Sequence, residues 1–509
     1  MIQFVSNLML SRGVNGVTRS LPREIRCFVA GMAYCCLSPL CALILFSASV
    51  MADSIDRPNI ILFLADDLGW NGLGSFGSDL YETPNIDALA AAGVKFTDAY
   101  SACTVCSPSR AAIMTGKYPA RLHLTDFIAG QNQPFAKLSI PEWTKGLQHS
   151  EVTIAEALTA EGYKTAHIGK WHLDFKGDQA PDGQPVDHGF DMQIMKPASK
   201  GYFMTAPAGG FNKGDFTTDY FASEAAGVVD RWKDDPFFLY FAFDVPHTPI
   251  QAKQELVDKY AAKVRPDAIH RNPVYAAMVQ SLDEAVGTVL QAVQRNGIEK
   301  RTVVIFTSDN GGLSHRFREP TGFTSNDPLR RGKGGAYEGG TRVPMIVRWP
   351  GVAPQASVCR EPVTGTDLYP TILEIANVVG DANHNAEVDG MSLVPLFRSP
   401  ESSLDREAIY WHYPHYHAGG FSLPGEPNNG PYSAIRSGQW KLIEYFEDER
   451  VELYDLDNDV RESKDLAAES PVRVARLQEK LEQWRRSVGA QLPTANADYD
   501  PVKAEPGAR

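Results

Sequence analysis

The stretch Asn59-Ile-Ile-Leu-Phe-Leu-Ala65, followed at once by Asp66-Asp67, decides the fold of this chain. An unbroken apolar run that ends at two acids is typical of a strand buried on both faces of a mainly parallel sheet. Similar runs predict strands at 237–243, 302–307 and 345–347, and helical patterns occur at 85–93, 152–162, 275–296 and 367–378. This alternation predicts an α/β fold, with a large, mixed, mainly parallel sheet sandwiched by helices.

The composition changes near residues 390–402, where Pro400 and two serines mark a boundary. Short strands at 432–436, 441–446 and 451–454 and a helix from Pro471 to about Val488 follow. They predict a smaller C-terminal α+β domain with a short antiparallel sheet and a helix. We therefore divide the chain into a leader (1–52), a main domain (57–398), the smaller domain (403–490) and an extended or disordered tail (491–509).

The first 52 residues have the pattern of an export segment. Arg23 and Arg26 precede a run from Cys27 to Ala52 without a charged residue, and Val50-Met-Ala52 offers a small-residue cleavage site. An uncleaved membrane anchor is the alternative, because the run is long enough to span a bilayer. In both cases the rest of the chain is exported, and a membrane contact is expected only if the leader is not cleaved.

Charge and cysteine usage exclude several classes of protein. The 509-residue chain carries a net charge of −13, which argues against a nucleic-acid partner and requires a local cluster of cations for any anionic substrate. Outside the leader only Cys103, Cys106 and Cys359 remain, so at most one disulfide, Cys103 to Cys359, is possible beside a modified Cys106. Cys103-x-x-Cys106 as a redox or zinc half-site lacks a second pair. The absence of an Asn-x-Ser/Thr sequon favours a bacterial periplasmic enzyme over a lysosomal glycoprotein.

Two polar pairs follow predicted strands directly. Asp66-Asp67 comes after the first strand, and Asp309-Asn310 comes after the strand at 302–307. Each pair alone suits an Asx-capped turn, but ligands of α/β sheets bind beyond the carboxyl ends of the strands. Three carboxylates and one amide oxygen form a hard oxygen set, which suits Ca²⁺ or Mg²⁺ and not zinc.

The segment Cys106-Ser-Pro-Ser-Arg110, continued by Ala-Ala-Ile-Met-Thr-Gly116, predicts a helix that starts at a small nucleophile. Ser107 or Ser109 can cap this helix, and Pro108 suits its first turn. Arg110 lies one turn beyond Cys106 on the same helix face. The helix N-terminus and the guanidinium then converge on one sulfur, which suits an oxyanion substrate.

Three further segments carry cations and histidines. In Gly169-Lys170-Trp-His172-Leu173, an extended backbone would place Lys170 and His172 on one face. Asp244-Val-Pro-His247 follows the strand at 237–243. A glycine-rich loop contains Lys333, with Glu338 and Arg342 as its expected structural supports.

Taken in this order, from about Pro58 to Leu466, these segments resemble the type I sulfatases, which have an alkaline-phosphatase-like fold. The resemblance implies that a formylglycine-generating enzyme converts Cys106 to Cα-formylglycine, whose hydrate is the nucleophile. It also implies a divalent metal, usually Ca²⁺, held by residue 106 together with Asp66, Asp67, Asp309 and Asn310.

The resemblance also implies a role for each remaining residue. Arg110, Lys170 and Lys333 would stabilise the sulfate. His172 would take a proton as sulfate leaves, and His247 with Lys333 would assist the leaving group.

The expected function is therefore an exported sulfatase that acts on sulfated polysaccharides or oligosaccharides, such as galactose or N-acetylgalactosamine sulfates. The cluster Trp411-His-Tyr-Pro-His415-Tyr-His417 suits stacking on a sugar ring, or else forms an ordinary aromatic patch between domains. Two alternatives remain. One is a phosphodiesterase or phosphonate monoester hydrolase of the same superfamily, and the other is a non-enzymatic carbohydrate-binding protein with an unmodified Cys106.

Overall fold

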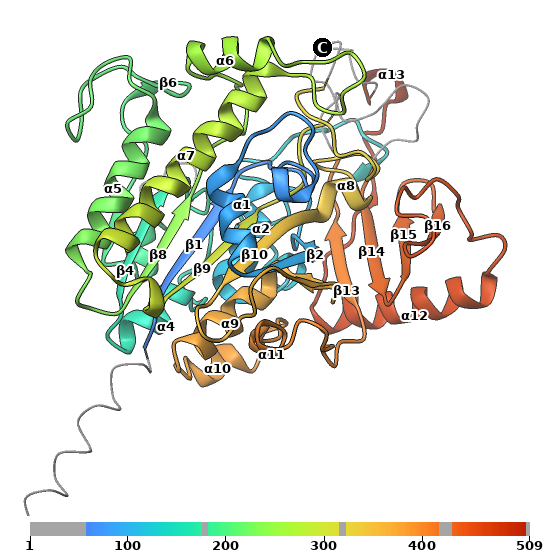
Figure 1. Ribbon diagram of the computed structural model, residues 1–509. Helices are drawn as coiled ribbons and strands as arrows, with labels where there is room; N and C mark the ends of the chain where they lie inside the picture. The colour runs from blue at the N-terminus through green and yellow to red at the C-terminus, as the bar shows by residue number, and fades with distance from the viewer. Residues whose placement is uncertain (1–56, 176–181, 315–321, 417–429, 505–509) are drawn as a thin grey trace, which may run out of the picture. The chain divides into compact units, whose positions relative to one another are not determined.

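A nine-stranded mixed sheet forms the centre of the fold (Figure 1). The structure is a computed structural model that describes residues 57–175, 182–314, 322–416 and 430–504. The strand order is β11-β2-β10-β9-β1-β8-β4-β5, and β12 also pairs with β2. The strands are β1 (Asn59–Ala65), β2 (Val94–Tyr100), β4 (Lys164–Gly169), β5 (Met192–Ile194), β8 (Phe237–Ala242), β9 (Thr302–Ser308), β10 (Arg342–Arg348), β11 (Ser357–Cys359) and β12 (Val363–Thr364). Strand β10 is antiparallel to both of its neighbours.

Helices cover both faces of this sheet, as the apolar runs predict. Along β1, Ile61 and Phe63 pack against one helix layer, and Ile60 and Leu62 pack against the other. The first layer contains α1 (Pro84–Ala91), α5 (Thr217–Arg231) and α7 (Pro273–Arg295), next to α6 (Gln254–Ala261). The second contains α2 (Cys106–Thr115), α4 (Ile154–Ala160), α9 (Leu368–Ile375) and α11 (Val394–Arg398). The α/β prediction is confirmed.

A second, antiparallel sheet lies in the C-terminal region (Figure 1). Its strands are β13 (Ile409–Tyr413), β14 (Tyr432–Ser437), β15 (Trp440–Tyr445) and β16 (Val451–Asp455), and α12 (Pro471–Ser487) packs on it. The tail is more ordered than expected, because β17 (Thr494–Ala495) pairs with β3 (Leu138–Ser139) and α13 (Pro501–Ala504) follows. The remaining short elements are α3 (Pro119–Leu122), β6 (Ser199–Lys200), β7 (Phe203–Met204), α8 (Glu338–Thr341) and α10 (Ala382–Asn385).

A buried ionic cluster joins the small sheet to the main one. The ammonium of Lys441 in β15 lies 2.9 Å from a carboxylate oxygen of Glu338 and 3.0 Å from one of Glu462, and all three side chains are inaccessible to solvent. The Tyr100 hydroxyl donates to Glu338 at 2.6 Å, and Arg342 pairs with Glu338 at 3.4 Å. Glu338 and Arg342 thus support the loop that precedes β10, as the sequence indicates.

The expected leader (1–52) lies outside the described residues, and so do His417 and the loop that follows it. Within the described ranges, no helix combines the length and the apolar character that a membrane span requires.

Candidate active site

The two polar pairs meet at one edge of the central sheet. Strands β1 and β9 run parallel, with Ala65 opposite Ser308, so the residues that follow each strand emerge side by side. The backbone N–H of Asp67 donates to Asp309 at 3.2 Å, and the Asn310 side-chain amide donates to Asp67 at 2.7 Å. Asp66 joins this group through Arg110, which lies 3.7 Å from Asp66 and 2.8 Å from Asp309. The structure therefore brings together the three carboxylates and the amide that the sequence offered as metal ligands beside residue 106.

The donor set fits a hard cation. Asp66 Oδ1, Asp67 Oδ2 and Asn310 Oδ1 are buried acceptors without a hydrogen-bond partner in the described structure. Buried polar atoms are otherwise almost always satisfied, so three orphaned oxygens on neighbouring side chains suit a divalent ion. Asp66, Asp67 and His247 also present ligand atoms within 4.8 Å of one another, which adds a histidine to the expected neighbourhood.

Three cations surround these carboxylates. The Lys170 ammonium lies 2.6 Å from Asp66, the Lys333 ammonium lies 2.6 Å from Asp67, and the Arg110 guanidinium lies 2.8 Å from Asp309. Burial raises the pKa of Asp309, and the nearby charge of Asp66 raises it further. Burial opposes ionisation of Asp66 as well, but the charges of Lys170, His247 and Arg110 hold its pKa well below its usual value.

Close backbone contact explains the glycines of the Lys333 loop. An added Cβ on Gly311 would lie 1.8 Å from the carbonyl oxygen of Gly339, and one on Gly340 would lie 2.0 Å from the carbonyl oxygen of Gly335. Only residues without a side chain allow the loop after β9 and the turn before β10 to approach this closely. This contact holds Lys333 beside Asp67.

Cys106 is the first residue of α2, so its sulfur lies at a helix N-terminus. The cap residue is Val105, and neither serine caps the helix, which corrects that expectation. Ser109 instead donates back to the carbonyl of Cys103 at 2.9 Å, and Ser107 accepts the backbone N–H of Ile128 at 3.1 Å. Both serines lie within the helix, where their hydroxyls bond to backbone groups outside it or one turn back.

Two histidines face the site, each with a ring orientation set by a carbonyl. Nε2 of His172 donates to the carbonyl of Ile128 at 2.6 Å, which leaves Nδ1 as the unprotonated atom, 3.3 Å from the Cys106 sulfur. Burial and the charge of Lys170 lower the pKa of His172 to about 3, so the ring is neutral. Nδ1 of His247 donates to the carbonyl of Thr248 at 2.6 Å, and Nε2 lies 3.7 Å from Asp67.

The backbone of the Lys170–His172 segment differs from the expectation. Strand β4 ends at Gly169, and His172 has a φ of 60°, so this segment is not extended. Lys170 and His172 nevertheless both line the site, because the turn directs them to Asp66 and to Cys106.

A cavity of about 710 Å³ opens over these groups. Its wall includes catalytic candidates from five segments of the chain: Asp66, Asp67, Cys106, Lys170, His172, His247 and Lys333. Arg110 is fully buried and is not among the described residues that line this cavity. Its guanidinium binds Asp309 and, at 2.6 Å, the carbonyl of Lys170.

Sequence reasoning missed the segment that positions His172. Asp126 accepts a hydrogen bond from the Tyr413 hydroxyl at 2.7 Å, and Thr125 bonds to His415 at 2.8 Å. These contacts from the C-terminal region anchor the chain just before Ile128, whose carbonyl orients His172. Nothing in the sequence links Asp126 to residues almost 290 positions away.

Asp126 is expected to make stability depend on pH. Burial raises the pKa of Asp126 to about 7, whereas the unfolded value is about 4. Between these values the folded protein keeps a proton that the unfolded chain has released, so the free energy of unfolding falls as pH rises. We expect Asp126→Asn, which keeps the acceptor for Tyr413, to raise stability by up to about 4 kcal/mol at pH 8 and by little at pH 4.

Thermal melts of Asp126→Asn at several pH values test this prediction. Asp267→Asn is the matched control, because the side chain of Asp267 is 84% exposed. A gain for Asp126→Asn that is the same at pH 4 and pH 8 would contradict the assignment.

The aromatic cluster that begins at Trp411 is part of the core. Trp411, His412, Tyr413 and His415 are all buried, and the first three lie in β13 and not in a loop. Trp411 donates to the carbonyl of Ser101 at 2.8 Å. Because all four rings are buried, the structure supports the alternative of an aromatic patch between domains and not a surface that stacks on a sugar.

None of the three cysteines outside the leader forms a disulfide, and only Cys106 lines the catalytic cavity. Cys103, Cys106 and Cys359 are buried free thiols, so the possible bridge from Cys103 to Cys359 is not formed. Burial raises the pKa of Cys103 to about 12 and that of Cys359 to about 11, which makes both unreactive.

The comparison with family models decides the classification. The sulfatase family model matches residues 58–378, and the model described as N-sulphoglucosamine sulphohydrolase, C-terminal, matches residues 332–487. The chain belongs to the sulfatase family. Members of this family are sulfuric ester hydrolases, so this sulfatase is an enzyme of that class.

Known sulfatases are similar in sequence to most of the length of this sulfatase. A sulfatase of Formosa agariphila is 33% identical, over 88% of this chain and 91% of the relative. Human arylsulfatase A is 32% identical, over 75% of this chain and 74% of the relative. The crystal structure of Ps i-CgsB has a TM-score of 0.69 at 30% identity, covering 87% of this chain and 94% of that one. A second structure of that protein, also with a TM-score of 0.69, at 29% identity and with the same coverage, is a complex with k-i-k-neocarrahexaose.

Proposed function

We propose that this sulfatase is exported and hydrolyses sulfate monoesters on sulfated polysaccharides or oligosaccharides, with residue 106 as the nucleophile. One observation carries the proposal. A helix N-terminus presents Cys106 to the same cavity wall as Lys170, Lys333 and two histidines, above a cluster of buried carboxylates. A nucleophile beside convergent cations is the arrangement that attack on an anionic ester requires.

Two groups beyond the encoded side chains complete the proposal. A formylglycine made from Cys106 by a formylglycine-generating enzyme supplies a hydrated aldehyde, whose hydroxyl is the nucleophile. Asp66, Asp67, Asp309 and Asn310 would hold a divalent ion, Ca²⁺ or Mg²⁺, next to residue 106. Such an ion supplies charge that polarises the sulfate oxygens and favours an ionised nucleophile.

The cations of this chain divide into two groups by position. Lys170 and Lys333 line the cavity, and each ammonium can turn from its carboxylate to a sulfate oxygen. Arg110 pairs with Asp309 at 2.8 Å and so holds that side chain in place among the other metal-ligand candidates. This assignment moves Arg110 from direct sulfate binding to support of the metal ligands.

The two histidines handle protons at defined atoms. Nδ1 of His172 points at residue 106 with a free lone pair, so it can accept a proton from that residue as sulfate departs. Nε2 of His247 and the Lys333 ammonium both lie near Asp67 and face the cavity. The Lys333 ammonium can neutralise the leaving alkoxide, and His247 can donate to it only when Nε2 is protonated as well, because Nδ1 already carries the proton of the neutral ring. The fixed tautomers mean that neither ring must turn over during the reaction.

The relatives support a carbohydrate substrate. Ps i-CgsB has been crystallised with an oligosaccharide of six sugars, and its fold covers most of this chain. A cavity of about 710 Å³ can receive a sugar residue with its sulfate group.

Mass spectrometry of the peptide that contains Cys106 tests the nucleophile in protein from the native host. We expect an aldehyde or its hydrate at this residue, and turnover of 4-nitrocatechol sulfate well above that of 4-nitrophenyl phosphate. Phosphate turnover that exceeds sulfate turnover would instead support the phosphodiesterase or phosphonate hydrolase reading. An intact thiol in protein that still hydrolyses sulfate esters would refute the proposed nucleophile.

A further inference from the structure

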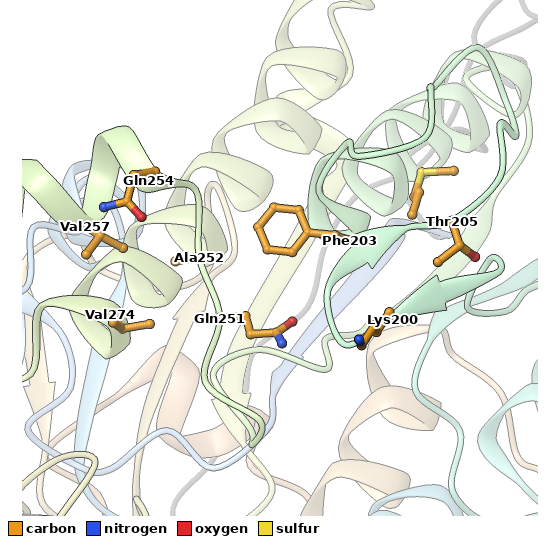
Figure 2. A pocket seen from close by; sticks show the side chains of 9 residues that line it. Lys200, Phe203, Thr205, Gln251, Ala252, Gln254, Val257 and Val274 are labelled. Carbon is orange, nitrogen blue, oxygen red and sulfur yellow. The ribbon is translucent and has the colours of Figure 1, made fainter.

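A second cavity lies between the β6–β7 hairpin and the start of α6 (Figure 2). Its volume is about 430 Å³, and it shares no lining residue with the catalytic cavity. Figure 2 shows Phe203 reaching from the hairpin toward Ala252, with Gln251 between the hairpin and the helix. The lining residues are Lys200, Phe203, Met204, Thr205, Gln251, Ala252, Gln254, Val257 and Val274.

Two stretches of chain run from the catalytic cavity to this second cavity. On the hairpin side, Tyr202 lines the catalytic cavity, while its neighbour Phe203 lines the second one. The Tyr202 hydroxyl donates to the carbonyl of His247 at 2.7 Å, and its backbone N–H donates to the Gln251 side chain at 3.2 Å. Tyr202 therefore joins both walls at the boundary between the two cavities.

On the opposite side, the wall passes from His247 in the catalytic cavity to Gln251 in the second. Four residues of fully extended chain span at most about 14 Å. A ligand that fills both cavities therefore needs only the length of a short oligosaccharide.

The second cavity offers a cation that has no partner. Within the described residues, Lys200 makes no ion pair or hydrogen bond through its ammonium group. The neighbouring lysines differ, because Lys196 lies 2.6 Å from Asp244 and Lys253 lies 3.1 Å from Asp219. Lys200 is exposed and lies opposite Phe203 across the β6–β7 hairpin, so in a chain with a net charge of −13 it gives an incoming anion on a polar ring a cation to bind beside an aromatic side chain.

We propose that this cavity binds a second, sulfated sugar residue of the same glycan, a short distance along the chain from the residue that is desulfated. Lys200 binds the sulfate of this second residue, Phe203 packs on its ring, and the side-chain amide nitrogen of Gln251, whose oxygen accepts from Tyr202, bonds to a hydroxyl. The inference rests on the proposed function, and it makes this sulfatase selective for oligosaccharides over single sulfated sugars.

Kinetics with matched substrates test this inference. A panel of hexasaccharides of the carrageenan, chondroitin sulfate and heparan sulfate types, with the corresponding sulfated monosaccharides, first identifies the fastest glycan. We expect kcat/KM of the wild type to favour that hexasaccharide over its monosaccharide. Lys200→Gln should lower kcat/KM for the hexasaccharide about tenfold, the value of one charge-assisted contact, and Lys200→Glu should lower it further.

Turnover of 4-nitrocatechol sulfate should stay unchanged in both variants, because an aryl sulfate fills only the catalytic cavity. Lys233→Glu, at an exposed position just beyond the C-terminal end of α5, is the matched charge control, and Phe203→Leu tests the ring separately. Equal hexasaccharide kinetics for Lys200→Glu and the wild type, or no preference for the hexasaccharide, would overturn the inference. Absence of turnover by the mature wild type of the aryl sulfate and of every sulfated glycan in the panel would instead overturn the proposed function.

Discussion

Replacing Cys106 with alanine is expected to lower sulfate ester hydrolysis by about 10⁴-fold or more while the protein stays folded. The sulfur lies at the N-terminus of α2, 3.3 Å from His172 Nδ1, and no other buried thiol faces the catalytic cavity among the described residues. Alanine removes the atom from which the nucleophile is made. The loss should therefore appear in kcat, and binding of a sulfated glycan should persist.

Cys359→Ala is the matched control for this prediction. Cys359 is also buried, but it lies in β11 at the far edge of the sheet. We expect the control to cost some stability by opening a small cavity and to keep its turnover. Activity in Cys106→Ala within tenfold of the control would mean that another group attacks the ester.

Removing divalent ions with a chelator is expected to lower turnover by about 10³-fold, the scale of losing a principal electrostatic contact in a transition state. Lys170 and Lys333 already lie on Asp66 and Asp67, each at 2.6 Å. Without a competing cation these ammonium groups stay on the carboxylates, so the sulfate loses two of its partners as well. Added Ca²⁺ or Mg²⁺ should restore turnover.

Melting temperature gives a readout of the same site that does not depend on activity. An ion at a hundred times its dissociation constant stabilises the folded state by about 2.7 kcal/mol. The stabilisation should be larger in Lys333→Met. This variant removes the ammonium next to Asp67 Oδ1, while Oδ2 already has no hydrogen-bond partner, so the ion becomes the main partner of this carboxylate. A chelator that leaves the melting temperature of both proteins unchanged would contradict a metal at this position.

Patterns of local sequence were enough to predict the sheet and the edge where the site forms. An apolar run such as 59–65 can be stable only when both of its faces are covered, so burial and parallel pairing follow from composition. Once β1 and β9 are neighbours, Asp66 and Asp309 must emerge together. The adjacency of these acids therefore follows from strand geometry and could be predicted from the sequence.

The side-chain directions depended on distant parts of the chain and could not be predicted in the same way. The sequence indicates that Arg110 follows Cys106 by one helical turn, but only the packed structure shows that it pairs with Asp309. The aromatic run at Trp411 has the composition of a sugar platform, yet β13 buries it against Ser101. Long-range burial decided both cases.

The ionic cluster around Lys441 bears on how this enzyme can be dissected. A shortened protein that ended before the small sheet would lack Lys441, so Glu338 would keep only Arg342 and Tyr100 as partners, and breaking a buried ion pair costs about 3–5 kcal/mol. Glu338 begins α8, five residues after Lys333, so the damage would reach the reaction centre. We therefore expect the catalytic loop to depend on the C-terminal sheet, and a sheet taken from a relative would need both Lys441 and Glu462 to keep this cluster.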